Sequence, residues 1–380
     1  MKKNQLVTLG KHIDILSGCA FPSSGFNRNN GVPLIRIRDI LSGKTETYYE
    51  GSYDLKYLIK KGDLLVGMDG DFNREYWKGT DALLNQRVCK ITPNPETLDK
   101  NFLYHFLQKE LDKIHATTDV VTVKHLSVKK IQDIKIRLPS LKEQKRIAAI
   151  LDKADAIRQK REQAIKLADD FLRAKFLEMF GTPANNIHRF PKGTIRDLVD
   201  SVNYGTSAKA SIDSGEYPIL RMGNITYQGR WDFTDLKYLD LSVKEKDKYL
   251  VKEGDLLFNR TNSKELVGKT AVYEEDRPMA FAGYLIRVRP NSIGNNYYIS
   301  GYLNSIHGKI TLMNMCKSIV GMANINAQEL QNIEILIPPK HLQDEYEIIY
   351  KKIKKGLSIY DKSAMQLQLL ASNLSNKYIM

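Results

Sequence analysis

The sequence has few cysteines and no long apolar run. Its three cysteines, Cys19, Cys89 and Cys316, are odd in number, lie far apart and form no CxxC pair. This usage argues against a disulfide framework or a structural zinc site and favours a reducing compartment. No apolar stretch approaches the roughly 18 residues that a membrane-spanning helix needs, and the N-terminal residues contain no signal-peptide core. We therefore expect a cytoplasmic protein.

Recognisable catalytic motifs are also missing. The string VGKT at 267–270 resembles the end of a phosphate-binding loop, but Ser263 stands where that loop requires glycine. No GxGxxG follows a strand pattern, and the seven histidines show neither HxH nor HExxH spacing. The Asn/Asp-Pro-Pro-aromatic tetrapeptide of amino-methyltransferases is absent too. These absences predict a protein without catalytic activity and without a metal or cofactor of its own.

Acidic residues are the minority charge. The chain has 58 lysines and arginines against 44 aspartates and glutamates, which gives a formal net charge of +14. Such an excess indicates a polyanionic partner, and nucleic acid is favoured because no basic amphipathic membrane anchor stands out. With 42% hydrophobic and 27% charged residues, the composition is otherwise that of an ordinary globular protein.

The sequence contains an internal duplication with a period of about 190 residues. Four pairs of segments match in the same order: VPLIRIRDI (32–40) with YPILRMGNI (217–225), KKGDLLVG (60–67) with KEGDLLFN (252–259), ITPN (91–94) with VRPN (288–291), and IQDIKIRLP (131–139) with LQNIEILIP (330–338). Because the order is preserved, the matches predict two structurally similar units.

Each unit has the pattern of an α+β domain with a strand-rich core. Residues 34–40 and 134–138 alternate as half-buried strands do, and each GDLL segment indicates a turn followed by a buried strand. Segments 101–114 and 297–310 have the pattern of amphipathic helices. The predicted organisation is a first globular domain, a central helix, a second globular domain and a distal helix, with boundaries at 1–140, 141–182, 183–339 and 340–380.

Two long helices are predicted to follow the globular domains. Residues 141–180 contain neither proline nor glycine, and Gly181 and Pro183 end the pattern. A helix of about 40 residues spans roughly 60 Å. The second helix covers about 342–375, where Gly356 is a weak point. Apolar residues that recur in heptad steps form the predicted coiled-coil core: Ile147, Ile150, Ala154, Ile157, Phe171, Tyr346, Ile349, Ile353, Tyr360, Leu367 and Leu374.

The sequence leaves two possibilities for the surface against which each apolar stripe packs. We expect the two stripes to pack on each other as an antiparallel coiled coil, because a pseudo-twofold relation between the halves reverses the second helix. The alternative is that each stripe packs on its own globular domain.

The loops after the two GDLL segments are rich in side chains that can contact DNA. They read GMDGDFNREYWKG (67–79) and FNRTNSKELVGK (258–269). In the major groove arginine pairs with guanine, asparagine or glutamine with adenine, and aspartate with cytosine, whereas lysine holds phosphates. The predicted DNA-binding residues are Arg36, Arg38, Asp69, Asp71, Asn73, Arg74, Gln86, Arg87, Lys124, Arg221, Asn259, Arg260, Thr261, Asn262, Ser263, Lys264 and Lys269. The alternative is that these segments are solvated turns.

This plan of variable domain, long helix, variable domain and long helix resembles the specificity (S) subunit of type I restriction-modification enzymes. LPSLKEQKRIAAILDKAD at 138–155 is similar to the start of the central helix in that family, and segments 62–91 and 255–269 are similar to strings of its target recognition domains. The second helix departs from the pattern, since it keeps Gln343 but has Leu342 where the first has Glu143.

The resemblance implies a bipartite reader of double-stranded DNA. Each target recognition domain would read one half-site, and the helices would act as a spacer and as docking surfaces. Two methyltransferase (modification) subunits and two restriction/translocase subunits would complete the enzyme and perform adenine methylation and restriction. S-adenosylmethionine, ATP and magnesium would belong to those partners. Two other classes stay open: a stand-alone two-headed DNA-binding or architectural protein, and an interaction scaffold for an acidic protein.

Overall fold

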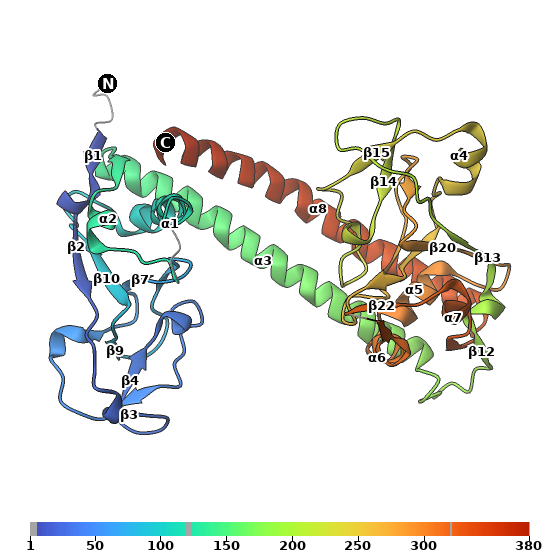
Figure 1. The fold of residues 1–380 in the computed structure, drawn as a ribbon, viewed down its shortest axis with the longest axis horizontal. Helices are drawn as coiled ribbons and strands as arrows, with labels where there is room; N and C mark the ends of the chain where they lie inside the picture. Colours follow the sequence, from blue (N-terminus) through green and yellow to red (C-terminus); the bar gives the residue numbers. More distant parts are fainter. Residues whose placement is uncertain (1–5, 119–122, 320, 380) are drawn as a thin grey trace. The chain divides into compact units, whose positions relative to one another are not determined.

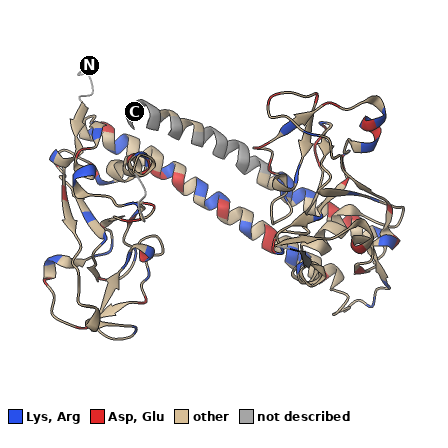
Figure 2. Cartoon of the chain, in the orientation of Figure 1, with Lys and Arg blue, Asp and Glu red and all other residues tan. Residues whose placement is uncertain are grey.

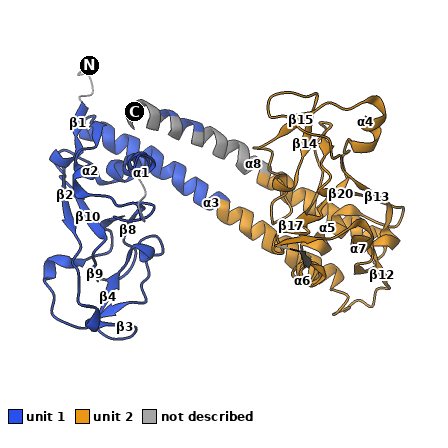
Figure 3. Cartoon of the chain, viewed as in Figure 1, with its two compact units in different colours: residues 1–161, 361–380 blue, residues 162–360 orange. Residues whose placement is uncertain are grey.

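The computed structural model describes residues 6–118, 123–319 and 321–379, without the side chains of 317–319, 358–368, 371–372 and 374–379. The chain forms two compact units (Figure 3), residues 1–161 with 361–380 and residues 162–360. Both boundaries fall inside long helices, so each long helix contributes to both units. This division differs from the predicted one, in which each long helix is a region of its own.

Unit 1 contains two larger sheets and one short strand pair (Figure 1). The first sheet has the order β2 (Ile13–Ser17), β10 (Val88–Pro93), β7 (Leu64–Gly67) and β8 (Arg74–Tyr76) and is antiparallel. The second has the order β3 (Phe26–Asn27), β5 (Tyr48–Tyr49), β4 (Val32–Ile35), β9 (Ala82–Leu84) and β6 (Leu58–Ile59), with β4 and β9 parallel. The short pair joins β1 (Leu6–Thr8) to β11 (Lys135–Arg137).

Unit 2 repeats this topology. Its main sheet has the order β13 (Val199–Tyr204), β20 (Leu285–Pro290), β16 (Leu256–Asn259) and β18 (Thr270–Val272). A second sheet has the order β15 (Lys237–Leu239), β14 (Tyr217–Leu220) and β19 (Ala280–Phe281), and here too one pair, β14 with β19, is parallel. The short pair is β12 (Lys192–Thr194) with β23 (Glu334–Leu336), and unit 2 adds a sheet of β17 (Thr261–Asn262), β22 (Met322–Asn324) and β21 (Lys317–Ile319).

The GDLL motif explains how the main sheets begin. Gly62 and Gly254 adopt φ of +92° and +87°, which favours glycine. The following aspartates close the turns, since Asp63 accepts a hydrogen bond from Lys60 N and Asp255 accepts one from Lys252 N, both at 2.9 Å. The two leucines then enter buried strands β7 and β16. The prediction of a turn followed by a buried strand is confirmed in both units.

Shorter helices cover the sheets of each unit: α1 (Lys100–Ala116) and α2 (Val128–Gln132) in unit 1, and α4 (Val243–Tyr249), α5 (Asn296–Asn304), α6 (Ile306–Met315) and α7 (Ala327–Gln331) in unit 2. The single helix predicted over 297–310 is wrong, because the chain breaks at Ser305. The buried Ser305 hydroxyl accepts a hydrogen bond from Gly308 N at 3.0 Å and starts α6. The strand predicted over 34–40 also ends early, at Ile35. There the Asp39 carboxylate accepts a hydrogen bond from Arg36 N at 2.9 Å and caps the 3₁₀ helix η3 (Ile37–Asp39).

The two long helices are α3 (Leu141–Phe180) and α8 (Lys340–Ile379). Near their starts, Gln144 and Gln343 are fully buried and have matching roles. Gln144 Nε2 donates to the carbonyl oxygens of Thr97 and Pro139, and Gln343 Nε2 donates to those of Ile293 and Pro338. The duplicated glutamine therefore attaches each helix to the domain that precedes it.

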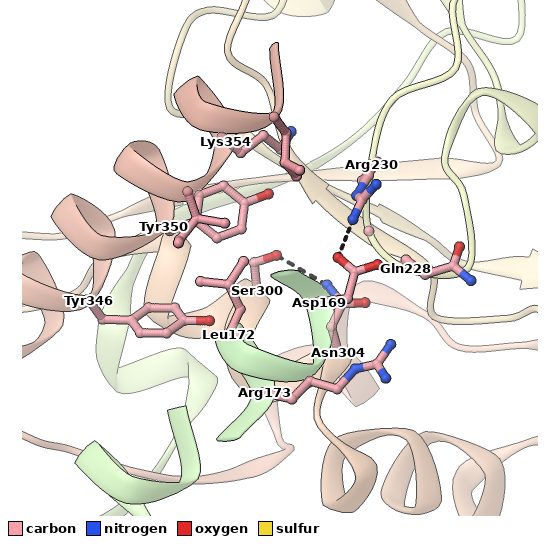
Figure 4. A pocket seen from close by; sticks show the side chains of 14 residues that line it. Asp169, Leu172, Arg173, Gln228, Arg230, Ser300, Asn304, Tyr346, Tyr350 and Lys354 are labelled. Atoms are coloured by element: carbon pink, nitrogen blue, oxygen red, sulfur yellow. Dashed lines mark hydrogen bonds and ion pairs between the residues drawn. The ribbon is translucent and has the colours of Figure 1, made fainter. Parts of the chain in front are cut away.

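Inside unit 2 the end of α3 runs antiparallel to the start of α8. The Phe176 and Phe180 rings of α3 lie edge-on to Tyr346 of α8, with ring centroids 5.3 and 5.9 Å apart. The two helices also border a small cavity of 50 Å³ with Arg230, shown in Figure 4. The cavity is flanked by ion pairs of Arg230 with Asp169 and of Lys354 with Glu274. Apolar packing and paired charges thus join the helices to this domain.

The predicted coiled-coil residues occupy several environments. Ile147 lies in the core of the first globular domain and Tyr346 in that of the second, which is the arrangement of the alternative prediction. Ile150, Ala154, Ile349 and Ile353 are half-buried, whereas Ile157 is exposed. Phe171, a predicted coiled-coil core residue, is 49% exposed, which differs from the prediction. The adjacent Leu172 is the residue that borders the cavity shared with α8. The side chains of Tyr360, Leu367 and Leu374 lie outside the described residues.

Candidate nucleic-acid interface

Three segments that are distant in sequence meet at one edge of unit 1. They are the β7–β8 loop (68–73), the β9–β10 turn (85–87) and segment 123–127. Met68 N donates to Arg87 O at 2.8 Å, and Leu126 N donates to Met68 O at 2.7 Å. The backbone of Met68 therefore joins the other two segments, and their side chains share one edge.

Unit 2 builds the same edge with the same backbone bonds. Arg260 N donates to Tyr284 O at 3.0 Å, and Ile325 N donates to Arg260 O at 2.9 Å. Thr261 pairs with Asn324 as Asp69 pairs with His125 in unit 1. The backbone positions of Asp69, Arg87 and His125 thus correspond to Thr261, Tyr284 and Asn324, so one scaffold carries two different sets of side chains.

A hollow of 440 Å³ lies at this edge of unit 1, lined by Phe26, Arg36, Ile37, Arg38, Asn85, Gln86 and Arg87. The Arg36 guanidinium lies 5.4 Å from the centre of the Phe26 ring. Its Nε is buried and has no hydrogen-bond partner among the described residues. Arg38, Gln86 and Arg87 are exposed. The hollow therefore combines an aromatic ring with side chains that can donate hydrogen bonds.

Other predicted residues of unit 1 do not line this hollow. The Arg74 guanidinium lies 3.4 Å from the centre of the Tyr104 ring, and Tyr104 is stacked on Tyr76. Asp71 is exposed and Asn73 is half-buried. Lys124 Nζ donates to His115 O at 2.6 Å, at the end of α1. In this structure Lys124 holds a helix end, which differs from the predicted phosphate contact.

In unit 2 the Arg260 guanidinium lies 4.9 Å from the centre of the Tyr204 ring. The Tyr204 hydroxyl accepts a hydrogen bond from Ala327 N at 2.9 Å, which fixes the ring. Thr261 Oγ1 donates to Asn324 Oδ1 at 3.1 Å, and Asn262 Oδ1 accepts from Ser263 N at 2.9 Å. Thr261, Asn262 and Ser263 are half-buried, and Lys264 is exposed. Arg260 is therefore presented on an aromatic support at the shared edge.

Charges of both signs alternate along α3 (Figure 2), so the long helix carries no continuous basic stripe. The described residues contain no group of His, Cys, Asp and Glu side chains that could hold a metal ion. None of the helices in the described part of the chain has the length and apolar character needed to cross a membrane. The basic and aromatic edges of the two units remain the features that fit a nucleic acid.

Comparison with known proteins shows the family to which the chain belongs. The family model described as "Type I restriction modification DNA specificity domain" matches residues 1–167 and 190–371. The chain belongs to this specificity family.

Relatives in the family are similar over most of their length. The specificity subunit of the type I restriction enzyme EcoBI from Escherichia coli is 30% identical over 401 residues, covering 97% of this chain and 82% of that protein. The specificity subunit of EcoKI from Escherichia coli strain K12 is 23% identical and covers 92% of this chain and 80% of that protein.

A solved S subunit from M. genitalium has a TM-score of 0.65 at 15% identity and covers 98% of this chain and 95% of its own. This likeness confirms the fold class predicted for the specificity chain, an α+β fold with two strand-rich domains and long helices.

Two predicted DNA-binding residues of this specificity chain are interior residues. Asn259 is 0% exposed, and its Nδ2 donates to Leu266 O at 3.3 Å, which holds the loop. Lys269 is 8% exposed, and its Nζ donates to Met222 O at 2.7 Å. Burial lowers the pKa of Lys269. Both predictions are corrected here, because these residues stabilise the loop from beneath instead of facing a ligand. Arg221 donates to Asp235 Oδ2 at 2.8 Å and is also engaged within the unit.

The sequence alone did not indicate the residues that support the arginines and the aspartate at this edge of each unit. Tyr204 and His125 lie far in sequence from Arg260 and Asp69, which they contact, and Phe26 lies outside the loop segments that the composition singled out. No motif or spacing in the sequence joins them. The internal repeat was the available signal, since it aligns Asp69 with Thr261 once the loops are superposed.

Proposed function

We propose that this chain is the subunit that reads the DNA sequence in a type I restriction-modification enzyme, with one half-site read by each unit. The observation that carries the proposal is the duplicated edge. Identical backbone bonds place Arg87 and Tyr284 at the same position, and Asp69 and Thr261 at another. Since corresponding backbone positions carry different side chains, the two units suit two different half-sites of one bipartite target.

The long helices have a proposed spacer role. A half-site read by each domain requires a fixed separation, and α3 and α8 are the continuous elements that belong to both units. Exposed Leu167 and Phe171 on α3 offer apolar surface to partner subunits. The internal repeat favours two methyltransferase subunits, one for each half, and two restriction/translocase subunits in the full enzyme. A solved chain that is similar to this one, with a TM-score of 0.50, comes from work on the complex assembly of its own type I system.

Catalysis is assigned to those partners in this proposal. The chain lacks the sequence motifs of methyltransferases and of phosphate-binding loops. S-adenosylmethionine, ATP and magnesium would therefore be bound by the modification and restriction subunits, and this chain would direct them to the target adenine without catalysing either reaction.

The test is competition binding by the chain in complex with its methyltransferase. Specific DNA-binding proteins typically hold their target about 10³-fold or more tighter than unrelated DNA. We expect this preference for a duplex with both half-sites and a marked loss when either half-site is scrambled. Equal binding to all duplexes would contradict sequence recognition. The same preference in the chain without any partner would instead support a stand-alone DNA-binding protein.

A further inference from the structure

An ion-paired cluster holds Arg87 in place at the edge of unit 1. Asp69 Oδ1 lies 2.6 Å from His125 Nδ1, and Asp69 Oδ2 lies 3.4 Å from Arg87 Nε. One carboxylate thus engages two side chains from two other segments. The Asp69 side chain is 24% exposed, whereas the Arg87 side chain is 55% exposed. The more buried member of the pair is the acid, and the arginine extends toward the surface.

The proton positions leave one side of the Arg87 guanidinium open. A carboxylate only accepts hydrogen bonds, so the short contact requires that His125 Nδ1 carries the hydrogen and donates it to Asp69. That nitrogen then cannot accept a hydrogen bond from Arg87 Nη1, which lies 3.4 Å away. With Nε in an ion pair with Asp69, the two Nη groups are available for a ligand in the hollow beside Gln86.

The backbone also presents Arg87 to this hollow. Arg87 adopts φ of +72°, a left-handed conformation that is uncommon for residues other than glycine. It occupies the turn between β9 and β10, and its carbonyl oxygen accepts the hydrogen bond from Met68 N. Such strained positions concentrate at ligand-binding sites, where the surrounding structure enforces them.

We propose that Arg87 reads a guanine in the half-site of unit 1 and that Asp69 is a positioning residue that does not contact DNA. In the major groove guanine presents two adjacent acceptors, O6 and N7, which match a pair of guanidinium N–H donors. The ion pair of Nε with Asp69 favours one arginine geometry before DNA arrives, so less side-chain freedom is lost on binding. The inference rests on the proposed function and adds the base and the residue that reads it.

The second unit provides an internal contrast. There the corresponding positions are Thr261, Tyr284 and Asn324, and none of these three side chains is charged. Arg260 occupies the place of Met68 and is supported by Tyr204 instead of an acid. The anchored Arg87 is therefore specific to unit 1, and its loss should leave the half-site of unit 2 unaffected.

The experiment is methylome sequencing of cells that express the chain with its methyltransferase. In the wild type we expect at least one guanine in the half-site of unit 1. In Arg87→Lys, which retains the charge but lacks the paired donors, preference for that guanine should fall by about 5- to 150-fold. Asp69→Asn should also relax the same position, whereas Asp81→Asn, which changes an exposed carboxylate of the same unit, should leave the motif unchanged. Equal thermal stability of the complexes would show that the variants fold.

Several results would overturn this inference. A split motif that Arg87→Lys and Arg87→Ala leave unchanged would show that Arg87 reads no base. Uniform loss of methylation at all sites with a smaller salt slope of binding would assign Arg87 to a phosphate. If Asp69→Asn unfolds the complex, relaxation by Arg87→Lys alone decides the guanine contact and Asp69 is a structural residue. The absence of any split motif in the wild type would instead reject the proposed function itself.

Discussion

Replacement of Arg260 by alanine tests whether unit 2 reads its half-site through the supported arginine. The guanidinium rests 4.9 Å from the centre of the Tyr204 ring, and the Arg260 backbone bonds to Tyr284 and Ile325 do not depend on the side chain. Arg260 is half-buried, so the substitution removes a partly desolvated cation–π contact, which is worth about 1 kcal/mol. Folding should therefore change little. Loss of a two-donor contact to a base costs about 1–3 kcal/mol, which is about a 5- to 150-fold change in preference.

The assay is competition binding by the methyltransferase complex, using duplexes substituted at each position of both half-sites. Arg260→Ala should flatten the preference at one or two positions of the second half-site and preserve every preference in the first. Lys264→Ala is the matched control, because Lys264 is exposed in the same loop and lacks an aromatic support. An equal loss of affinity across both half-sites would refute the reasoning and make Arg260 a phosphate or structural contact.

Three further predictions concern other parts of the chain. Lys264→Glu should lower the slope of log affinity against log salt by about one unit if Lys264 neutralises one phosphate, and an unchanged slope would place Lys264 away from DNA. By contrast, Lys269→Glu should lower the melting temperature of the protein, because that lysine is buried. Gln144→Ala should lower the free energy of unfolding by about 3 kcal/mol. The loss should exceed that of Gln343→Ala, because Gln144 also accepts a hydrogen bond from Asp99 N, and chemical denaturation measures the free energy of unfolding of both variants. One heptad inserted in each long helix adds roughly 10 Å to that helix and should lengthen the gap between half-sites by at most about 3 base pairs. Altered half-sites, or an unchanged gap in an active complex, would reject the spacer role.

The fold could be predicted where the sequence repeats or where turn-forming residues mark the end of an element. The GDLL turns, the boundaries of α3 and the order of domains all follow from local signals such as Gly62 and Gly181. The break at Ser305 could not be predicted, because it depends on a buried hydroxyl that caps α6 within the folded domain. The partners of the helix stripes also depend on packing, since Ile147 lies in a domain core and Phe171 faces outward.

The candidate edge could likewise be predicted only in part from the sequence. Composition indicated two candidate loops, but it could not distinguish a side chain at the surface from one beneath it. Asn259 and Arg260 are neighbours in sequence, yet the first is buried because strand β16 directs it inward, and the second lies against Tyr204. Likewise, Asp69 looks like a residue that reads cytosine until the structure places it between His125 and Arg87.

The measurement that tests the central claim most directly is the methylome of a strain that expresses this chain with its methyltransferase and lacks other adenine methyltransferases. We predict one asymmetric motif, with two different specific half-sites separated by a gap of fixed length and a methylated adenine in each. Exchange of residues 183–339 for the corresponding domain of another specificity subunit should replace one half-site and retain the other. A continuous motif, or an exchange that changes both half-sites together, would contradict the account.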